Sequence, residues 1–86
     1  MYYTYVLISN KDGNFYIGFT NNIEKRLEEH LQGKVVSTAN RIPFRLIYYE
    51  ACLNKHDALK REKYFKSGFG RRFLKNRLEE FLISEF

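Results

Sequence analysis

With 86 residues, the chain can form one modest hydrophobic core and hardly a second, so we expect a single domain over residues 1–86. Hydrophobic residues make up 44% and aromatic residues 17% of the sequence, which argues against intrinsic disorder. The net charge of +5 is compatible with an anionic partner, and the single cysteine, Cys52, excludes an intrachain disulfide or a cysteine-rich metal cluster.

The first predicted element is a β-hairpin. Residues 2–8 and 14–19 are rich in aromatic and β-branched side chains, and a Lys-Asp-Gly turn signal at 11–13 lies between them. Alternation places Tyr16 and Gly18 on the same side of the second strand. A glycine inside a strand indicates a bulge or the close approach of another group.

A helix is expected next, from Asn22 to Gln32. Asn21 and Glu24 have the spacing of a capping box, and Gly33 is a typical residue at a helix end. The apolar residues repeat at helical spacing and predict the buried stripe of this helix: Ile23, Leu27 and Leu31.

Residues 34–43 show no clear period and include the only proline, which favours a surface loop with room for a short turn of helix. Residues 44–51 (FRLIYYEA) read as a third strand. Asn54 is a suitable N-cap for a second long helix, which we expect to end at Gly68 or Gly70. A last helix carries an apolar stripe with basic flanks, formed by Phe73, Leu74, Arg77, Leu78, Phe81 and Leu82.

The order β-β-α-β-α-α predicts an α+β fold with a three-stranded, mainly antiparallel sheet flanked by helices. No apolar run is long enough to span a membrane and no basic leader precedes the first strand, so we expect a cytoplasmic protein. The last helix carries more apolar surface than one face requires, which leaves a monomer and a weak homodimer both open. The residues that supply this surface are Phe81, Leu82, Ile83 and Phe86.

Positive charge is concentrated in the C-terminal part of the chain. Residues 60–77 contain eight basic residues and a single acid, Glu62. Such a run is a candidate phosphate-binding patch, although a solvated helix face has a similar composition. The basic residues are Lys60, Arg61, Lys63, Lys66, Arg71, Arg72, Lys75 and Arg77.

Polar residues at apolar positions give sharper candidates for a site. Glu62 falls on the same helical face as Ala58, Phe65 and Phe69, where a carboxylate needs water, a basic partner or a cation. An ion pair with Lys66 or Arg61 would satisfy it as well as a metal ion would.

Arg26 and His30 lie four residues apart on the first helix, beside its apolar stripe. An arginine in such a place can hold a phosphate oxygen and stabilise charge in a transition state. Pairing of Arg26 with Glu29, next to a partly exposed His30, is the simpler alternative.

These residues, taken in order, resemble the GIY-YIG nuclease superfamily over essentially the whole chain. The resemblance rests on Thr4-Tyr5-Val6, on Tyr16-Ile17-Gly18, on Arg26 with His30, and on Glu62. The HLQG and PFRLIYYE stretches add to it, and small stand-alone bacterial members are the most similar. The first motif departs from glycine-isoleucine-tyrosine, which leaves Tyr3 as an alternative register.

The resemblance implies a role for each matching position. One of Tyr5 and Tyr16 would activate or orient the attacking water, while Arg26 would stabilise the pentacovalent phosphate and His30 would line the site. Glu62 would bind a single divalent ion, Mg²⁺ or Mn²⁺. Asn76 matches a late polar residue found in part of the family, and it joins the proposed substrate-binding residues Lys60, Arg61, Lys63, Lys66, Arg71 and Arg72.

The implied activity is metal-dependent hydrolysis of a nucleic-acid backbone, with DNA favoured over RNA. No added recognition domain is evident, so recognition of structure rather than sequence is expected, with DNA repair or recombination as a hypothesis by analogy. A nucleic-acid-binding module with the same fold but without cleavage, and a small protein-interaction domain, are the alternatives.

Overall fold

The computed structural model describes residues 1–85, which form a three-stranded sheet in the order β2-β1-β3. The strands are β1 (Tyr2–Ser9), β2 (Phe15–Thr20) and β3 (Phe44–Cys52), and β1 pairs antiparallel with both neighbours. The α+β fold expected from the sequence, with an antiparallel sheet of three strands and flanking helices, is therefore confirmed.

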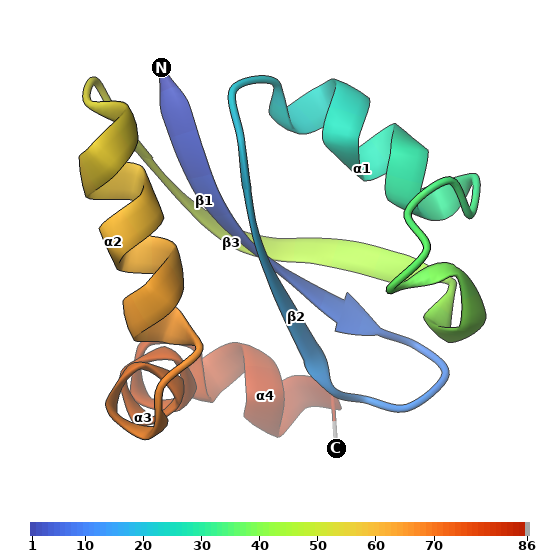
Figure 1. Ribbon diagram of the computed structural model, residues 1–86. Coiled ribbons are helices and arrows are strands. Elements are labelled where there is room, and N and C mark those ends of the chain that lie inside the picture. The colour runs from blue at the N-terminus through green and yellow to red at the C-terminus, as the bar shows by residue number, and fades with distance from the viewer. Residues whose placement is uncertain (86) are drawn as a thin grey trace.

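Helices α1 (Ile23–Leu31) and α2 (Lys55–Phe65) flank the β1–β2 hairpin, as Figure 1 shows. Alternate residues of the central strand β1 therefore enter two different cores. Tyr5 and Leu7 pack with Phe44 and the apolar stripe of α1, whereas Val6 packs with Phe65 of α2. Burial on both faces explains why β1 reads as a nearly continuous apolar run.

The cap of α1 lies one residue later than the sequence spacing suggested. Asn22 accepts a hydrogen bond from the backbone N–H of Lys25 at 3.1 Å, so the capping box expected between Asn21 and Glu24 was wrong in register. The helix ends at Leu31, and Gly33 follows with φ +74°. The predicted helix is otherwise confirmed, but its buried stripe was predicted one residue too long, because Leu31 in the last turn is 44% exposed.

The boundary between α2 and α3 (Gly68–Arg77) was predicted wrongly. The side chain of Ser67 caps α3 by accepting from the backbone N–H of Gly70 at 3.1 Å, so α2 ends at Phe65 rather than at a glycine. Gly70 is instead a packing residue, because a Cβ there would overlap the Tyr64 carbonyl. Phe69 consequently leaves the inward face and is 74% exposed.

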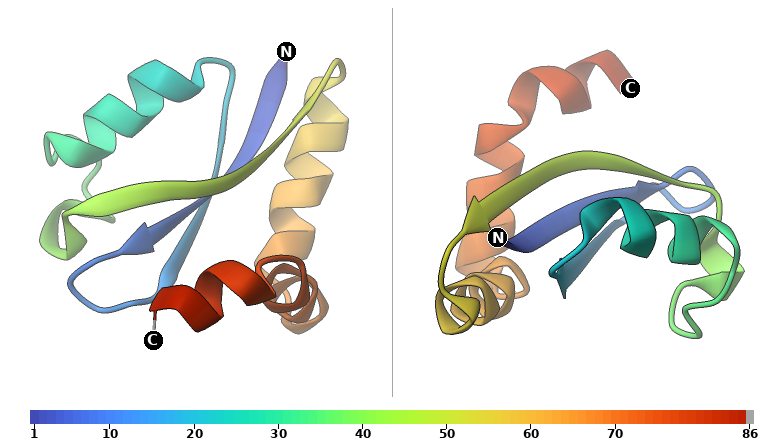
Figure 2. Two further views of the ribbon diagram at one scale, coloured as in Figure 1. Left: turned by 180° about the vertical axis from the view of Figure 1, so that it is seen from behind. Right: turned by 90° about the horizontal axis from the view of Figure 1, so that it is seen from above.

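The predicted last helix is divided at Leu78 into α3 and α4 (Glu79–Glu85). α4 lies behind the sheet in Figure 1 and on the near side in the left view of Figure 2, and its Glu85 pairs with Arg45 of β3 at 2.6 Å. Ile83 is 64% exposed, and Phe86, also expected at an interface, lies outside the described residues. Over residues 1–85, no helix combines the length and apolar character that a membrane crossing requires.

The segment expected to be a surface loop does contain a short 3-10 turn, Ala39–Arg41. Its placement entirely on the surface was wrong, because Val35 and Thr38 are buried. An ion pair of 2.7 Å between Arg41 and Asp12 ties this segment to the hairpin turn. The tertiary path of the loop, which local sequence does not encode, brings Thr38 under α1.

Candidate active site

The centre of the candidate site is a hydrogen bond between Tyr5 and His30. The Tyr5 hydroxyl lies 2.8 Å from His30 Nε2, and both side chains are buried although each carries a polar group. Tyr5 reaches this position because its ring crosses over Gly18, where a Cβ would overlap it. The close approach predicted for Gly18 is thus an approach of Tyr5. Tyr3, in the alternative register, packs against Tyr49 instead.

Thr38 fixes the other side of the His30 ring. Its hydroxyl lies 2.8 Å from His30 Nδ1 and 3.3 Å from the Val35 carbonyl. If Thr38 donates to that carbonyl, its oxygen accepts the proton of Nδ1, and Nε2 is left to accept from Tyr5. This assignment satisfies all three polar side groups at once.

Burial sets the protonation states of both rings. Desolvation, reinforced by the positive charge of Arg26, lowers the pKa of His30 to about 4, so its imidazole is neutral at neutral pH. Desolvation also raises the pKa of Tyr5 to about 12, against the opposing effect of Arg26. A neutral acceptor therefore faces a protonated phenol, which is the arrangement that the hydrogen bond requires.

Tyr16 lies beside this pair and is only half-buried. Its ring centroid is 5.0 Å from that of His30 and 6.4 Å from that of Tyr5. Within residues 1–85, the hydroxyl of Tyr16 forms no hydrogen bond with Tyr5 or with His30. The structure therefore brings both predicted tyrosines together with His30, but in unequal environments.

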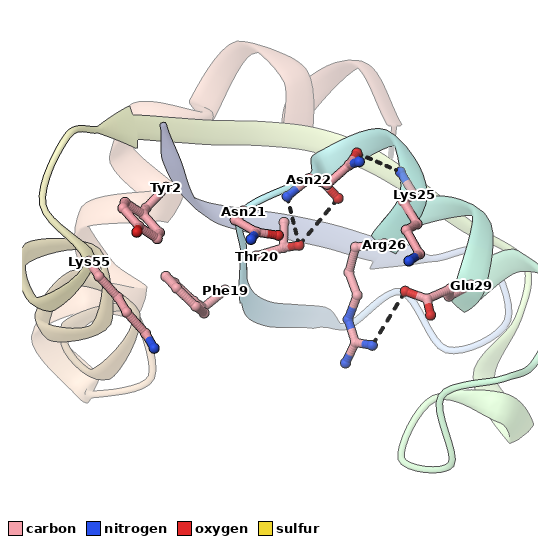
Figure 3. Close-up of a pocket in the computed structure, with 9 residues that line it drawn as sticks. All are labelled: Tyr2, Phe19, Thr20, Asn21, Asn22, Lys25, Arg26, Glu29 and Lys55. Atoms are coloured by element: carbon pink, nitrogen blue, oxygen red, sulfur yellow. Dashed lines mark hydrogen bonds and ion pairs between the residues drawn. The ribbon is translucent and has the colours of Figure 1, made fainter.

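Arg26 lies between the buried Tyr5–His30 pair and an open pocket. Its side chain is 35% exposed and lies 3.7 Å from Glu29, the alternative partner expected from the sequence. The cavity of 460 Å³ in front of it is drawn in Figure 3 and is called here the Arg26 pocket. Besides Arg26 and Glu29, its wall includes Tyr2, Phe19, Lys25 and Lys55.

Glu62 occupies the α2 side of the site. Its side chain is 21% exposed and accepts from Lys66 Nζ at 3.3 Å, so the predicted ion pair with Lys66 is present. The negative charge of Glu62 is close enough to contribute to the raised pKa of Tyr5. In the described part of the chain, no three His, Cys, Asp or Glu side chains gather in a way that could hold a metal ion.

The predicted substrate-binding residues differ in their surroundings. Lys66 and Arg71 line a second cavity, of 240 Å³, together with Tyr16. Arg61 is held by Glu50 at 2.8 Å and lies over the Phe65 ring, which gives it a structural partner. The remaining predicted residues are exposed and lie outside both cavities: Lys60, Lys63, Arg72 and Asn76.

Sequence reasoning missed three residues of the site. Lys25 and Lys55 line the Arg26 pocket, and Thr38 holds His30. Lys25 could have been found from its place beside Arg26 in the first turn of the helix. Lys55 and Thr38 carry no local signal, because each reaches the site through the path of a distant segment.

Comparison with known proteins gives a consistent result. Residues 1–79 match the family model described as the GIY-YIG catalytic domain. A UPF0213 protein of Lacticaseibacillus paracasei is 48% identical over 66 residues, covering 76% of this chain and 73% of the relative. One of Bacillus licheniformis is 48% identical over 66 residues, with 76% and 67% covered. The solution NMR structure of the UPF0213 protein of Bacillus halodurans is 32% identical, with a TM-score of 0.47 over 98% of this chain and 84% of that one.

Proposed function

The chain belongs to the GIY-YIG catalytic-domain family, and from this membership we propose that it is an endonuclease that hydrolyses DNA with one divalent ion. Hydrolysis would be directed by the structure of the DNA rather than by its sequence, as in repair or recombination. The observation that carries the proposal is the buried hydrogen-bond network of Tyr5, His30 and Thr38, in which the Tyr5 hydroxyl lies beside Arg26.

In the proposed mechanism, Tyr5 orients the attacking water. Its own proton is committed to His30 Nε2 at 2.8 Å and Arg26 interacts with its oxygen, so one lone pair remains to accept a hydrogen bond from water. With a pKa of about 12 it stays protonated at neutral pH and does not act as a phenolate. Tyr16, the more exposed of the two tyrosines, is assigned as the group that accepts the proton of the attacking water.

Arg26 is assigned to the phosphate. It is partly exposed at the wall of the cavity, where it contacts Glu29 at 3.7 Å and also interacts with the Tyr5 hydroxyl. Its guanidinium therefore lies beside Tyr5, where it can bind a non-bridging oxygen of the phosphate. A guanidinium binds such oxygens bidentately and stabilises the charge that grows on them during attack.

Glu62 fits a hard divalent ion such as Mg²⁺ or Mn²⁺. A lone, partly exposed carboxylate suits an ion that retains most of its waters, and it does not provide the three protein ligands that a catalytic zinc ion requires. When bound, the ion supplies charge stabilisation for the phosphate and the leaving oxygen. Lys66 competes for the same carboxylate at 3.3 Å and would have to turn away.

The basic residues around the site are assigned to the substrate backbone. Lys66 and Arg71 border the cavity beside Tyr16, and Lys60, Lys63, Arg72 and Asn76 extend the exposed surface. Contacts of this kind bind phosphate without reading sequence and weaken as salt increases.

The test is cleavage of labelled linear, flapped and branched DNA, and of RNA, with Mg²⁺ or Mn²⁺. Wild-type protein is compared with Glu62→Gln, Arg26→Ala and a matched control, Glu80→Gln, which neutralises an exposed carboxylate in the first turn of α4. We expect metal-dependent products from the wild type and the control, and a large loss of product from the two site variants.

Other outcomes would reject parts of this proposal. Salt-sensitive binding without cleavage of any substrate by the wild type would favour the non-cleaving binding module. Equal cleavage by Glu62→Gln would remove the assigned metal ligand. Comparison of Tyr5→Phe with Tyr16→Phe tests the division of labour, because loss of the group that accepts the proton of water should lower kcat more than loss of the group that only orients the water.

A further inference from the structure

We infer that the Arg26 pocket receives one unpaired nucleotide next to the phosphate that is cleaved, which makes single-stranded DNA, or the unpaired strand of a flap or gap, the substrate class. This inference rests on the proposed function for the chemistry at Arg26. It assigns a role to five residues outside that mechanism: Tyr2, Phe19, Asn21, Lys25 and Lys55.

The pocket has an aromatic wall. The rings of Tyr2 and Phe19 are stacked, with centroids 6.1 Å apart and planes inclined by 10°. Both rings are only half-buried and border the cavity, as Figure 3 shows. Nucleobases bind single-strand proteins by stacking on aromatic rings of this kind, and every base can do so because each has a π-face.

Positive charge lines both sides of the pocket, with Lys55 beside the aromatic rings and Lys25 and Arg26 across from them. Lys25 and Arg26 come from the first turn of α1, whereas Lys55 comes from the start of α2, so two separate helices direct cations at one cavity. Glu29 is the only acid on the wall, and it lies 3.7 Å from Arg26. A nucleotide matches this arrangement because it carries one aromatic face and flanking phosphates.

The size of the pocket also fits a nucleotide. Its volume of 460 Å³ lies within the range of about 300–1,000 Å³ that is usual for small-ligand sites. Asn21 adds an exposed side-chain amide at the rim, with the donor and the acceptor that a base edge requires. The neighbouring Asn22 is already committed to capping α1.

Occupation of this pocket selects against intact duplex. A base can enter it only after leaving its stack and its pair, which costs least where the nucleotide is already unpaired. Because Arg26 both lines the pocket and is assigned to the phosphate, the bound base lies next to the cleaved bond.

The experiment measures binding in chelator, so it does not depend on cleavage. A fluorescein-labelled single strand of DNA is made in a series, with one abasic nucleotide moved a single position at a time, and its Kd is measured by fluorescence anisotropy. Wild-type protein should show one position at which loss of the base weakens binding by about tenfold. In Phe19→Leu, which keeps the apolar volume and removes the ring, this penalty should vanish.

Two further variants complete the test. Tyr49→Leu alters an exposed aromatic residue on β3 away from the pocket and should keep the wild-type pattern. Lys55→Gln, at an exposed position where folding is not at risk, should reduce the slope of log Kd against log salt by about one.

A flat abasic profile, or a penalty that persists in Phe19→Leu, would overturn this inference, as would an unchanged salt slope in Lys55→Gln. If the DNA is nevertheless cut, the proposed function stands without it. If the expected binding pattern is found but no DNA is cut, the nucleotide pocket stands and the nuclease assignment fails.

Discussion

The two halves of the candidate site are built in opposite ways. On the α1 side, Tyr5, His30 and Thr38 are buried and joined by two hydrogen bonds of 2.8 Å each. On the α2 side, Glu62 is partly exposed and held only by Lys66, four residues along the same helix. Packing therefore holds the α1 side in one arrangement before any substrate binds. On the α2 side, Glu62 stays in contact with solvent and can exchange Lys66 for another partner.

This difference shows which parts of the site the fold itself can hold in place. A buried polar network is rigid because breaking one bond leaves an unsatisfied group in the core, at a cost of about 1–3 kcal/mol. An exposed pair four residues apart on a helix is worth only about 0.3–0.5 kcal/mol. We therefore expect changes in the buried network of Tyr5, His30 and Thr38 to alter stability as well as chemistry, and changes on the α2 side to alter chemistry with little effect on stability.

The largest effect is expected from Glu62→Gln. The substitution removes the charge of the assigned metal ligand, and cleavage should fall on the order of a thousandfold, about 4 kcal/mol in the barrier. Thermal unfolding should hardly change, because only the contact with Lys66 is lost. Rates with saturating Mg²⁺ and melting curves on the same preparation check both statements. A large fall in Tm would contradict the comparison by giving Glu62 a structural role.

The next effect is the dependence of stability on pH through His30. Its pKa falls from 6.5 to about 4 on folding, so between these values the unfolded chain binds more protons than the folded one. The contribution of His30 to the free energy of unfolding is therefore fully present above pH 6.5. It is lost as the pH falls toward 4, and amounts to about 3 kcal/mol in all.

Denaturant unfolding across this pH window gives the slope of the free energy of unfolding against pH. NMR titration of the imidazole then assigns that slope to His30. His56→Gln, which replaces an exposed histidine in the first turn of α2 and leaves the buried network intact, is the matched control. Asp12 has a pKa lowered to about 2, mainly by its hydrogen bond with Arg41, so its own stabilising effect is lost only at pH values below this window. Constant stability from pH 6.5 to 4 would mean that the α1 side is not a neutral, preorganised network.

Thr38→Val should have a smaller effect, of about 1–3 kcal/mol on unfolding. The change keeps the shape of the side chain but leaves His30 Nδ1 without its 2.8 Å partner in the core. Cleavage should also slow, because the tautomer that accepts from Tyr5 is no longer fixed. Thr38→Ser keeps the hydroxyl and should retain the rate. If Val and Ser behave alike, Thr38 is a packing residue and does not orient His30.

The same contrast separates what the sequence could predict from what it could not. Alternation in the strands and the helical spacing of Arg26 and His30 depend on neighbouring residues, so the fold and this part of the site were accessible. Gly18 in a strand also predicted a close approach, and Tyr5 is the group that approaches.

Other features depend on residues far apart in the chain. Thr38 is buried only because the loop after α1 passes beneath His30, and Lys55 lines the same pocket as Arg26 only because α2 begins beside it. The break after Phe65 was missed because Ser67 was not recognised as a cap, and glycine was given the role of terminator instead. Capping chemistry could have located that break, whereas no local pattern could have located Thr38.

The smallest effect is expected from Lys66→Gln, and its sign tests the open half of the site. Stability should change by no more than about 0.5 kcal/mol, because the lost pair is exposed. The ammonium group competes with a metal ion for Glu62, so its removal should reduce the Mg²⁺ concentration for half-maximal cleavage by roughly twofold at saturating DNA. Loss of a phosphate contact should at the same time raise the KM for DNA and lower the salt slope by about one. An increased Mg²⁺ requirement at saturating DNA would mean that Lys66 holds Glu62 in its active position, and the α2 side would then be preorganised as well.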